Sequence, residues 1–296
     1  MATFRAEPTK FATANGTNIA YRLFGAPSAP TNPPLVFLQH FRGTMNHWDP
    51  LLLAPLSLTR PILLLDYVGV GSSPGSVRDN FLSSAKDVIA LLTSLNIKTT
   101  DLLGFSIGGF VAQLVTLEAP SLVRRLILAG TGPSAGEGLE SGPQELFVDF
   151  VNAATIQENE KIYLRAFFTG GEGKQERGRE WWGRIHGNEK DGDGGYLVSE
   201  ATKMQVEAVV KWISGKGTDG KEVVDGEKSY ERLGEIKCPV FVLAGKEDQV
   251  VPLMNAVVLC KLIKQARLVV FEDVGHGLLI DYVDEVVKNI ELFLGS

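Results

Sequence analysis

The sequence predicts an α/β protein in which helices flank a mostly parallel central sheet and a purely helical segment is inserted. Short continuous apolar runs alternate with segments of helical periodicity, which is the pattern of successive βαβ units. The alternation breaks once, between about residues 133 and 233. With 296 residues, 44% hydrophobic and 22% charged, the chain has the composition of a globular protein that buries a sizeable core.

The first two predicted strands form a hairpin over residues 11–25, because Asn15-Gly16 is a favoured two-residue turn. Each later strand is predicted from a short apolar run, since such runs suit strands buried on both faces of a parallel sheet. The runs are PLVFLQ (34–39), PILLLD (61–66), DLLGF (101–105), RRLILAG (124–130), PVFVLAG (239–245) and ARLVVFED (266–273).

Helices are predicted between these runs. Apolar residues of 84–95 share one helical face, and Ser84 and Asp87 have the spacing of a capping box at its start. A second helix over 108–119 is stopped by Pro120. An amphipathic helix over 283–294 closes the chain.

The break in alternation indicates an insertion. Residues 134–233 contain helix-like stretches but no clear strand, and a hundred residues is too long for a loop in a compact domain. We therefore predict a core of residues 1–133 and 234–296, with 134–233 as a helical cap, or lid. The segment begins at the carboxyl end of a predicted strand. Sheets of this kind bind ligands at the carboxyl ends of their strands, so the cap should cover that edge.

Charge and cysteine usage restrict the partners and the compartment. A formal net charge of −6 and a pI near 5.4 argue against a nucleic-acid partner, because no basic surplus exists to displace phosphate counterions. We expect no signal peptide in MATFRAEPTK and no membrane span. Cys238 and Cys260 should be buried, reduced thiols. The prediction is a soluble, cytoplasmic protein, without a predicted oligomeric state.

A lone serine stands where an apolar strand stops and an apolar helix begins, in Gly104-Phe105-Ser106-Ile107-Gly108. This is the G-x-S-x-G pattern of a nucleophile elbow, a sharp strand-to-helix turn that glycines relieve of crowding. The turn exposes the serine hydroxyl and directs the N–H of Ile107 toward a bound acyl oxygen. Ser106 is therefore the predicted nucleophile.

A nucleophilic serine needs a base, and the chain has four histidines. His276 lies between glycines in the loop after the last predicted strand, where its ring can reach the sheet edge. His47 and His186 have irregular polar surroundings and are expected to be incidental. His276 is therefore the predicted base.

The base needs an acid that fixes its tautomer and stabilises the imidazolium. Asp248 follows the apolar run 239–245, and Glu247 is the adjacent competitor. The chain order Ser106, Asp248, His276 is that of hydrolases with a nucleophile elbow. Asp248 is the predicted acid.

Together these residues resemble the α/β-hydrolase superfamily, in its serine-nucleophile branch. The resemblance covers nearly the whole chain, weakly in 134–233, and implies an α/β-hydrolase fold with a Ser-His-Asp triad. It rests on five blocks that occur in the family's order: VFLQHFRG, LLLDYVGVGSSPG, DLLGFSIGGFVAQ, LAGKEDQVVP and VGHGLLIDY.

One block departs from the family pattern. The family usually has His-Gly before its oxyanion residue, whereas this chain has Gln39-His40, so His40 takes the place of the usual glycine. Carried over by position, the N–H of Phe41 pairs with that of Ile107 as the oxyanion hole. His40 is also a candidate polar contact for the substrate.

The sequence predicts no cofactor and no metal. In GVGSSP (69–74), Pro74 replaces the third glycine of a dinucleotide-binding fingerprint, so a simple bend is expected. No His, Cys, Asp or Glu residues have the spacing of zinc ligands. Trp181 and Trp182 either pack the cap against itself or form a substrate-binding roof for an apolar ligand.

The resulting hypothesis is a cofactor-free serine hydrolase that cleaves a small ester or lactone with an apolar body through an acyl-enzyme. The same triad supports other chemistry, namely C–C bond hydrolysis, haloperoxidase or perhydrolase activity, or a lyase or cyclase step. A ligand-binding receptor that retains the triad stays an alternative. In each case the partner is a small molecule.

Overall fold

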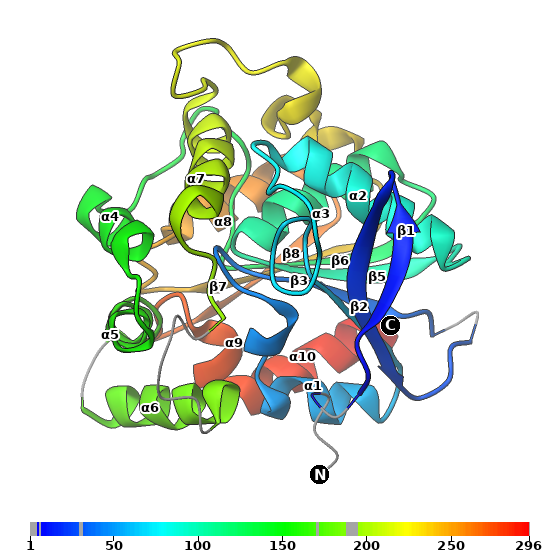
Figure 1. The fold of residues 1–296 in the computed structure, drawn as a ribbon, viewed down its shortest axis with the longest axis horizontal. Helices are drawn as coiled ribbons and strands as arrows, with labels where there is room; N and C mark the ends of the chain where they lie inside the picture. The colour runs from blue at the N-terminus through cyan, green and yellow to red at the C-terminus, as the bar shows by residue number, and fades with distance from the viewer. Residues whose placement is uncertain (1–4, 6, 30–31, 170–171, 188–194, 296) are drawn as a thin grey trace.

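A computed structural model describes residues 5, 7–29, 32–169, 172–187 and 195–295. Part of MATFRAEPTK, in which we expect no signal peptide, lies outside the described residues. Eight strands form one sheet in the order β1-β2-β4-β3-β5-β6-β7-β8 (Figure 1). Only the β1/β2 and β2/β4 pairs are antiparallel, which confirms the predicted mostly parallel sheet. The strands are β1 (Lys10–Ala14), β2 (Thr17–Gly25), β3 (Leu35–Leu38), β4 (Pro61–Leu65), β5 (Thr100–Phe105), β6 (Val123–Ala129), β7 (Val240–Gly245) and β8 (Ala266–Phe271).

The predicted hairpin at the sheet edge is confirmed. β1 and β2 are joined by Asn15 and Gly16, whose φ angles of 47° and 74° are those of a two-residue turn with both central residues left-handed. Asparagine and glycine are the residues that adopt this conformation at least cost.

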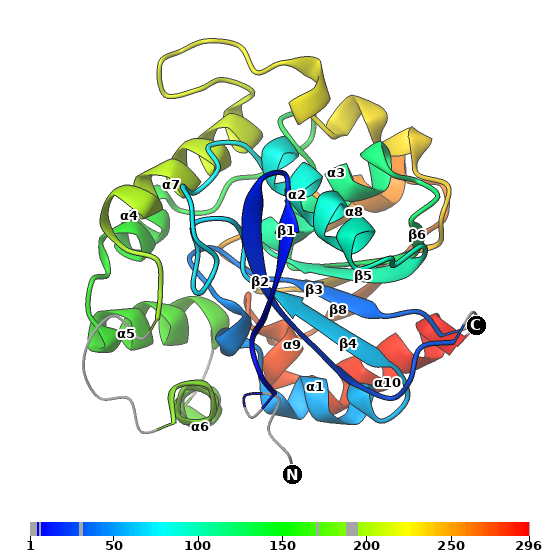
Figure 2. The ribbon, with the colours of Figure 1, turned by 45° about the vertical axis from the view of Figure 1, so that its right-hand side comes forward.

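Helices cover both faces of the sheet, and alternate residues of β3 show how (Figures 1 and 2). Leu35 and Phe37 belong to a buried cluster with α1 and α10, whereas Val36 and Leu38 belong to a second cluster with α2, α3 and α8. These helices are α1 (Pro50–Ser57), α2 (Phe81–Ser94), α3 (Ile107–Glu118), α8 (Leu253–Leu262) and α10 (Val283–Gly295), with a short α9 (Leu278–Asp281) before the last. The strands are therefore buried on two sides, as their continuous apolar runs predict.

The start of α2 corrects the sequence prediction. The helix begins at Phe81, and the N-cap is Asn80, whose Oδ1 accepts a hydrogen bond of 2.8 Å from Ser83 N. The predicted capping box of Ser84 and Asp87 is wrong, because both residues lie inside the helix. The carboxylate of Asp87 instead binds Arg78, whose Nε donates to Asp87 Oδ2 at 2.8 Å.

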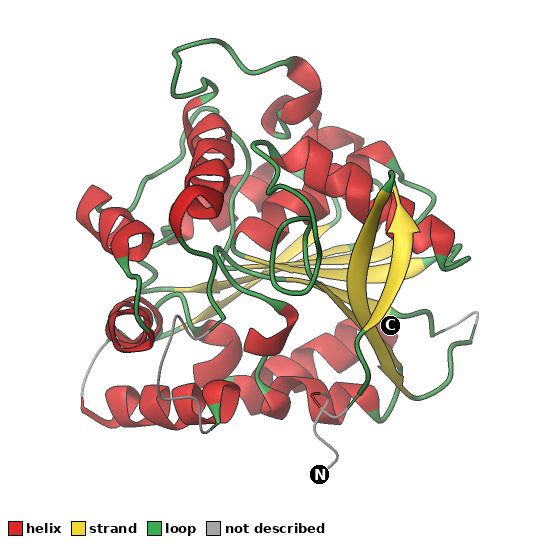
Figure 3. Cartoon of the chain, viewed as in Figure 1, coloured by secondary structure: helices red, strands yellow, loops and turns green. Residues whose placement is uncertain are grey.

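The segment between β6 and β7 is helical in its described part (Figure 3). Its elements are α4 (Gln144–Asn152), α5 (Ile156–Phe167), α6 (Glu172–His186) and α7 (Ser199–Ser214), followed by the short 3-10 helices η3 (Asp225–Glu227) and η4 (Tyr230–Glu235). Another 3-10 helix, η2 (Met45–His47), precedes α1. In Figure 1, α4 to α7 lie together at the left of the picture, beyond one end of the sheet.

The two cysteines are free thiols, but each is half-buried rather than buried as the sequence predicted. Desolvation raises the pKa of both to about 11, so that the neutral thiol dominates at pH 7. Within the described ranges, no helix has the length and apolar content needed to cross a bilayer.

The cap of α2 gives a test of the fold. Asn80→Ala should lower the free energy of unfolding by about 1 kcal/mol, because it leaves an N-terminal amide of the helix without its acceptor. Ser84→Ala is the matched control and should change stability little. Urea denaturation of both variants measures this, and a larger loss for Ser84→Ala would restore the cap predicted from the sequence.

Candidate active site

Ser106 lies in a strained turn between β5 and α3. Its φ of 56° and ψ of −123° fall in a region that a residue with a side chain rarely adopts. Such a conformation costs on the order of 1–3 kcal/mol and persists only where the surroundings hold it. Ser106 N donates to Ala129 O at 3.0 Å, and Thr131 Oγ1 donates to Ser106 O at 2.8 Å.

Glycines around Ser106 allow the helix to touch the strands. A Cβ on Gly108 would lie 1.9 Å from Leu38 O, and one on Gly104 would lie 2.4 Å from Gly108 O. Any larger residue would push α3 away from the sheet and move the serine with it. The G-x-S-x-G pattern therefore has the structural role that the sequence predicts.

His276 and Asp248 form a buried pair beside Ser106. His276 Nδ1 lies 2.7 Å from Asp248 Oδ2, and both side chains are almost fully buried. The other carboxylate oxygen, Oδ1, accepts from the backbone N–H groups of Val250 and Val251 at 2.8 and 2.9 Å. With Nδ1–H donated to the carboxylate, His276 Nε2 carries the lone pair that a general base needs.

The choice between the two neighbouring acids follows from burial. Asp248 is buried and contacts the imidazole, whereas Glu247 is exposed. Asp248 follows β7 and His276 follows β8, so both reach the site from the carboxyl edge of the sheet.

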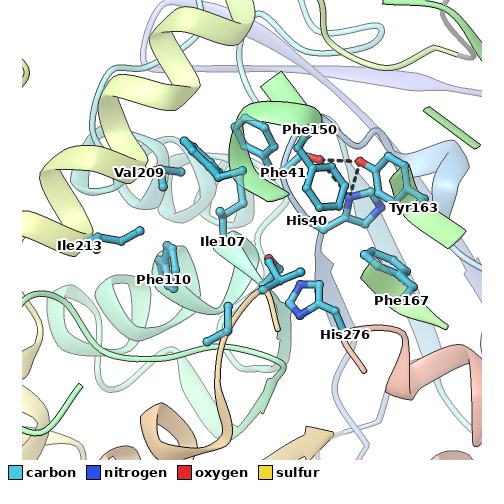
Figure 4. A pocket seen from close by; sticks show the side chains of 14 residues that line it. His40, Phe41, Ile107, Phe110, Phe150, Tyr163, Phe167, Val209, Ile213 and His276 are labelled. Carbon is cyan, nitrogen blue, oxygen red and sulfur yellow. Dashed lines mark hydrogen bonds between the residues drawn. The ribbon is translucent and has the colours of Figure 1, made fainter. Parts of the chain in front are cut away.

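Ser106 and His276 open into a common cavity of about 80 Å³ (Figure 4). Apart from His40, Ser106, Tyr163 and His276, its lining side chains are apolar, and six of its fourteen lining residues come from α4, α5 and α7. The lining residues are His40, Phe41, Ser106, Ile107, Phe110, Phe147, Phe150, Tyr163, Phe167, Val209, Ile213, Val250, Val251 and His276. The helical segment therefore contributes a large part, although less than half, of the enclosure of the serine.

A larger cavity of about 420 Å³ adjoins the first. We call the cavity of Ser106 the inner cavity and this second one the outer cavity. The two share six lining residues, Phe110, Phe147, Phe150, Ile213, Val250 and Val251. The outer cavity extends along the segment 132–144 and carries Glu140 and Gln144 at its wall. An apolar group larger than the inner cavity has room to continue into the outer one.

Phe41 and Ile107, the two candidates for oxyanion donors, both line the inner cavity. Ile107 is the first residue of α3, so its N–H has no acceptor within the helix. The Phe41 N–H has no acceptor among the described residues. Both residues remain the predicted oxyanion donors, each with an N–H group that no described helix or strand bond uses.

His40 is accommodated without distortion at the family's glycine position. Its backbone does not have a positive φ, and a Cβ on Gly43 would lie 2.7 Å from His40 Cε1, so Gly43 makes room for the ring. His40 Nδ1 lies 3.0 Å from Phe41 O and 3.4 Å from Tyr163 Oη. Desolvation lowers the pKa of His40 to about 4, which leaves the imidazole neutral at pH 7.

Trp181 and Trp182 do not line either cavity, so of the two alternatives the structure favours packing within the cap over a substrate-binding roof. Trp181 is 0% exposed and packs behind Phe167, with ring centroids 5.6 Å apart. Trp182 lies behind Tyr163 at 6.0 Å. The sequence missed Tyr163 because an aromatic residue on a helix carries no signal of which helical face meets the ligand.

His47 and His186 are also not incidental loop residues. His47 ends η2 and His186 ends α6, and both are buried around Tyr196, with ring centroids 4.0 and 5.7 Å from it. Neither lines the cavity of Ser106. Across the ranges that the structure describes, no three His, Cys, Asp or Glu side chains gather as metal ligands would.

A sequence model described as the alpha/beta hydrolase fold matches residues 33–282. An alpha/beta hydrolase fold protein from Chitinophaga pinensis is 31% identical, with 99% of each chain covered and a TM-score of 0.83. Proline iminopeptidase PfmaB from Pestalotiopsis fici is 27% identical over 96% of this chain and 99% of its own. Est816, described as an N-acyl homoserine lactone degrading enzyme, is 25% identical over 96% and 100%, with a TM-score of 0.71.

The buried acid gives a second test. Asp248→Asn should lower turnover by roughly 10³–10⁴-fold, because the amide can donate to His276 and favour the wrong tautomer. Glu247→Gln is the matched control and should leave turnover near that of the unchanged protein. Steady-state kinetics on a chromogenic ester compares them, and a reversed ranking would move the acid to Glu247.

The position of Trp181 gives a third test. Trp181→Ala should lower the free energy of unfolding by about 3–5 kcal/mol, because it leaves a cavity in the packed interior. Ile213→Ala alters a half-exposed residue that lines the cavity, so it should change KM with little loss of stability. Thermal melts and ester kinetics separate the two effects. Unchanged stability with a shifted KM in Trp181→Ala would place that ring against the substrate.

Proposed function

The chain belongs to the alpha/beta hydrolase fold family, and within it we propose a cofactor-free serine hydrolase that cleaves a small ester or lactone with an apolar body. The observation that carries the proposal is that His276, hydrogen-bonded to Asp248, opens with Ser106 into one largely apolar cavity. In this proposal, residues 134–233 are the cap over that cavity.

The chemistry follows from the proposed roles. Ser106 Oγ attacks the carbonyl carbon while His276 Nε2 takes its proton, and the proton then passes to the leaving alcohol. The acyl-enzyme is hydrolysed by a water molecule that His276 deprotonates, which returns Ser106 to its starting form. Asp248 orients His276 and stabilises the imidazolium throughout.

The N–H groups of Phe41 and Ile107 are the proposed donors to the oxygen that becomes negative. Each such donor is worth roughly 3–4 kcal/mol of transition-state stabilisation in a site of this kind. The low-dielectric surroundings increase that contribution, because few solvent dipoles compete with the two N–H groups.

The wall of the inner cavity favours a neutral, apolar substrate. Its polar side chains are His40, Ser106, Tyr163 and His276, and it contains no Asp, Glu, Lys or Arg. A charged group would lose its hydration there without gaining an ionic partner. This favours an ester or a lactone, as in the lactone-degrading relative, over a peptide with a charged terminus, although a fungal relative is named as a peptidase.

Labelling with a fluorophosphonate probe tests the nucleophile. The probe should add once, at Ser106, and Ser106→Ala should abolish the addition, since it removes only the attacking hydroxyl. Intact-protein and peptide mass spectrometry measure both results. The matched control is Thr131→Ser, which retains the hydroxyl bonded to Ser106 O and should still be labelled.

A panel of neutral esters and lactones tests the substrate class. We expect turnover of members with an apolar body and weaker turnover of matched members that carry a carboxylate or an ammonium group. Absence of labelling, or labelling away from Ser106, would overturn the enzyme proposal in favour of a ligand-binding protein. Preference for the charged members would overturn the proposed substrate class alone.

A further inference from the structure

Arg42 stands out because it follows the proposed oxyanion donor Phe41 and is buried completely. Its exposed fraction is 0%, although arginine is among the residues that are seldom buried. Its φ of 62° lies in the left-handed region, which costs a residue with a side chain free energy. A conformation of this kind requires contacts that hold it.

The guanidinium of Arg42 binds three parts of the helical segment. Nη1 donates to Phe150 O and to Asn159 Oδ1, and Nη2 donates to Ala153 O at 2.6 Å. Phe150 lies in the last turn of α4 and Ala153 is its C-cap, so the cation meets carbonyls at the negative end of a helix. Nε donates to Leu197 O, in the segment that precedes α7.

The backbone around Arg42 is held by the same segment. Arg42 N donates to Gln205 Oε1 at 2.6 Å, and Leu197 N donates to Arg42 O at 3.0 Å. Tyr163 Oη donates to Phe41 O at 3.0 Å. The peptide groups on both sides of Arg42 therefore take their orientation from α5, α7 and the segment between α6 and α7.

These contacts determine where the Phe41 N–H points. Gly43 N donates to His40 O at 3.1 Å, which closes the turn. Because the peptide between His40 and Phe41 is trans, the Phe41 N–H points away from that carbonyl. Rotation of the loop at Arg42 would therefore change the direction of the proposed donor.

We propose that Arg42 is a positioning residue through which the helical segment aligns the oxyanion hole. The proposal rests on the hydrolase function proposed above. A guanidinium that loses its acceptors while buried is strongly unfavourable, so the loop 39–43 and the helices α4, α5 and α7 hold one another in place. The helical segment thereby acts on the reaction itself as well as enclosing the substrate.

Arg42→Met tests the proposal against a matched variant, Arg184→Met. Arg184 also ties the helical segment to the rest of the chain, through Asp49 at 2.8 Å, but it does not contact the loop 39–43. Arg42→Met should lower kcat for a neutral ester about 10- to 100-fold with KM unchanged, because a displaced donor is lost mainly in the transition state. Arg184→Met should leave kcat unchanged. Equal losses of kcat in the two variants would overturn the proposal.

Two further variants distinguish an effect on the oxyanion hole from a loss of folding. Arg42→Lys retains the charge but not the planar fork, so it should recover only part of the lost kcat. Gln205→Ala removes the acceptor of the Arg42 N–H and leaves the guanidinium in place, and it should lower kcat less than Arg42→Met. Full activity in both variants would also overturn the proposal.

Hydrogen–deuterium exchange gives a readout that needs no substrate. Amides of residues 39–47 should exchange faster in Arg42→Met than in Arg184→Met, while peptides from β5 and β6 exchange alike in the two. Unchanged exchange over 39–47 would overturn the coupling, whatever the enzyme hydrolyses. Failure of the labelling at Ser106 would instead count against the hydrolase function.

Discussion

The contact between α3 and the strand edges is the constraint on which the site depends. Gly108 lies so close to Leu38 O that no side chain fits there, and Ser106 must adopt a positive φ to connect strand and helix at that distance. The free-energy cost of this turn is recovered from the burial of α3, nearly every residue of which is enclosed. The position of Ser106 is thus set by the packing of the whole layer rather than by its own contacts.

The other groups of the site reach the serine from loops that follow parallel strands. Asp248 and His276 come after β7 and β8, and Phe41 comes after β3. Asp248 is buried, and its lost hydration is replaced by two backbone N–H groups and the imidazole. The arrangement that makes this carboxylate tolerable in the interior is also the one that orients His276.

Local patterns in the sequence were sufficient for the sheet and for the order of Ser106, Asp248 and His276. They were not sufficient for features that depend on distant packing. Asn80 rather than Ser84 caps α2, and Phe167 rather than the Trp181 ring packed against it lines the cavity. Helical periodicity shows that a face is apolar, but it does not show which neighbour that face meets.

Arg42 illustrates the same limit with a charged residue. Charge in a loop ordinarily indicates exposure to solvent, yet this side chain is enclosed by carbonyl groups of the helical segment. Two of the ion pairs that also join this segment to the core, Arg177–Asp281 and Lys211–Asp79, keep one partner substantially exposed, so water and salt weaken them. The bonds of Arg42 are shielded from both, and a buried donor without an acceptor is far costlier than a separated surface pair. At the loop beside the serine, the helical segment is therefore held by bonds that water and salt reach less easily than they reach these two pairs.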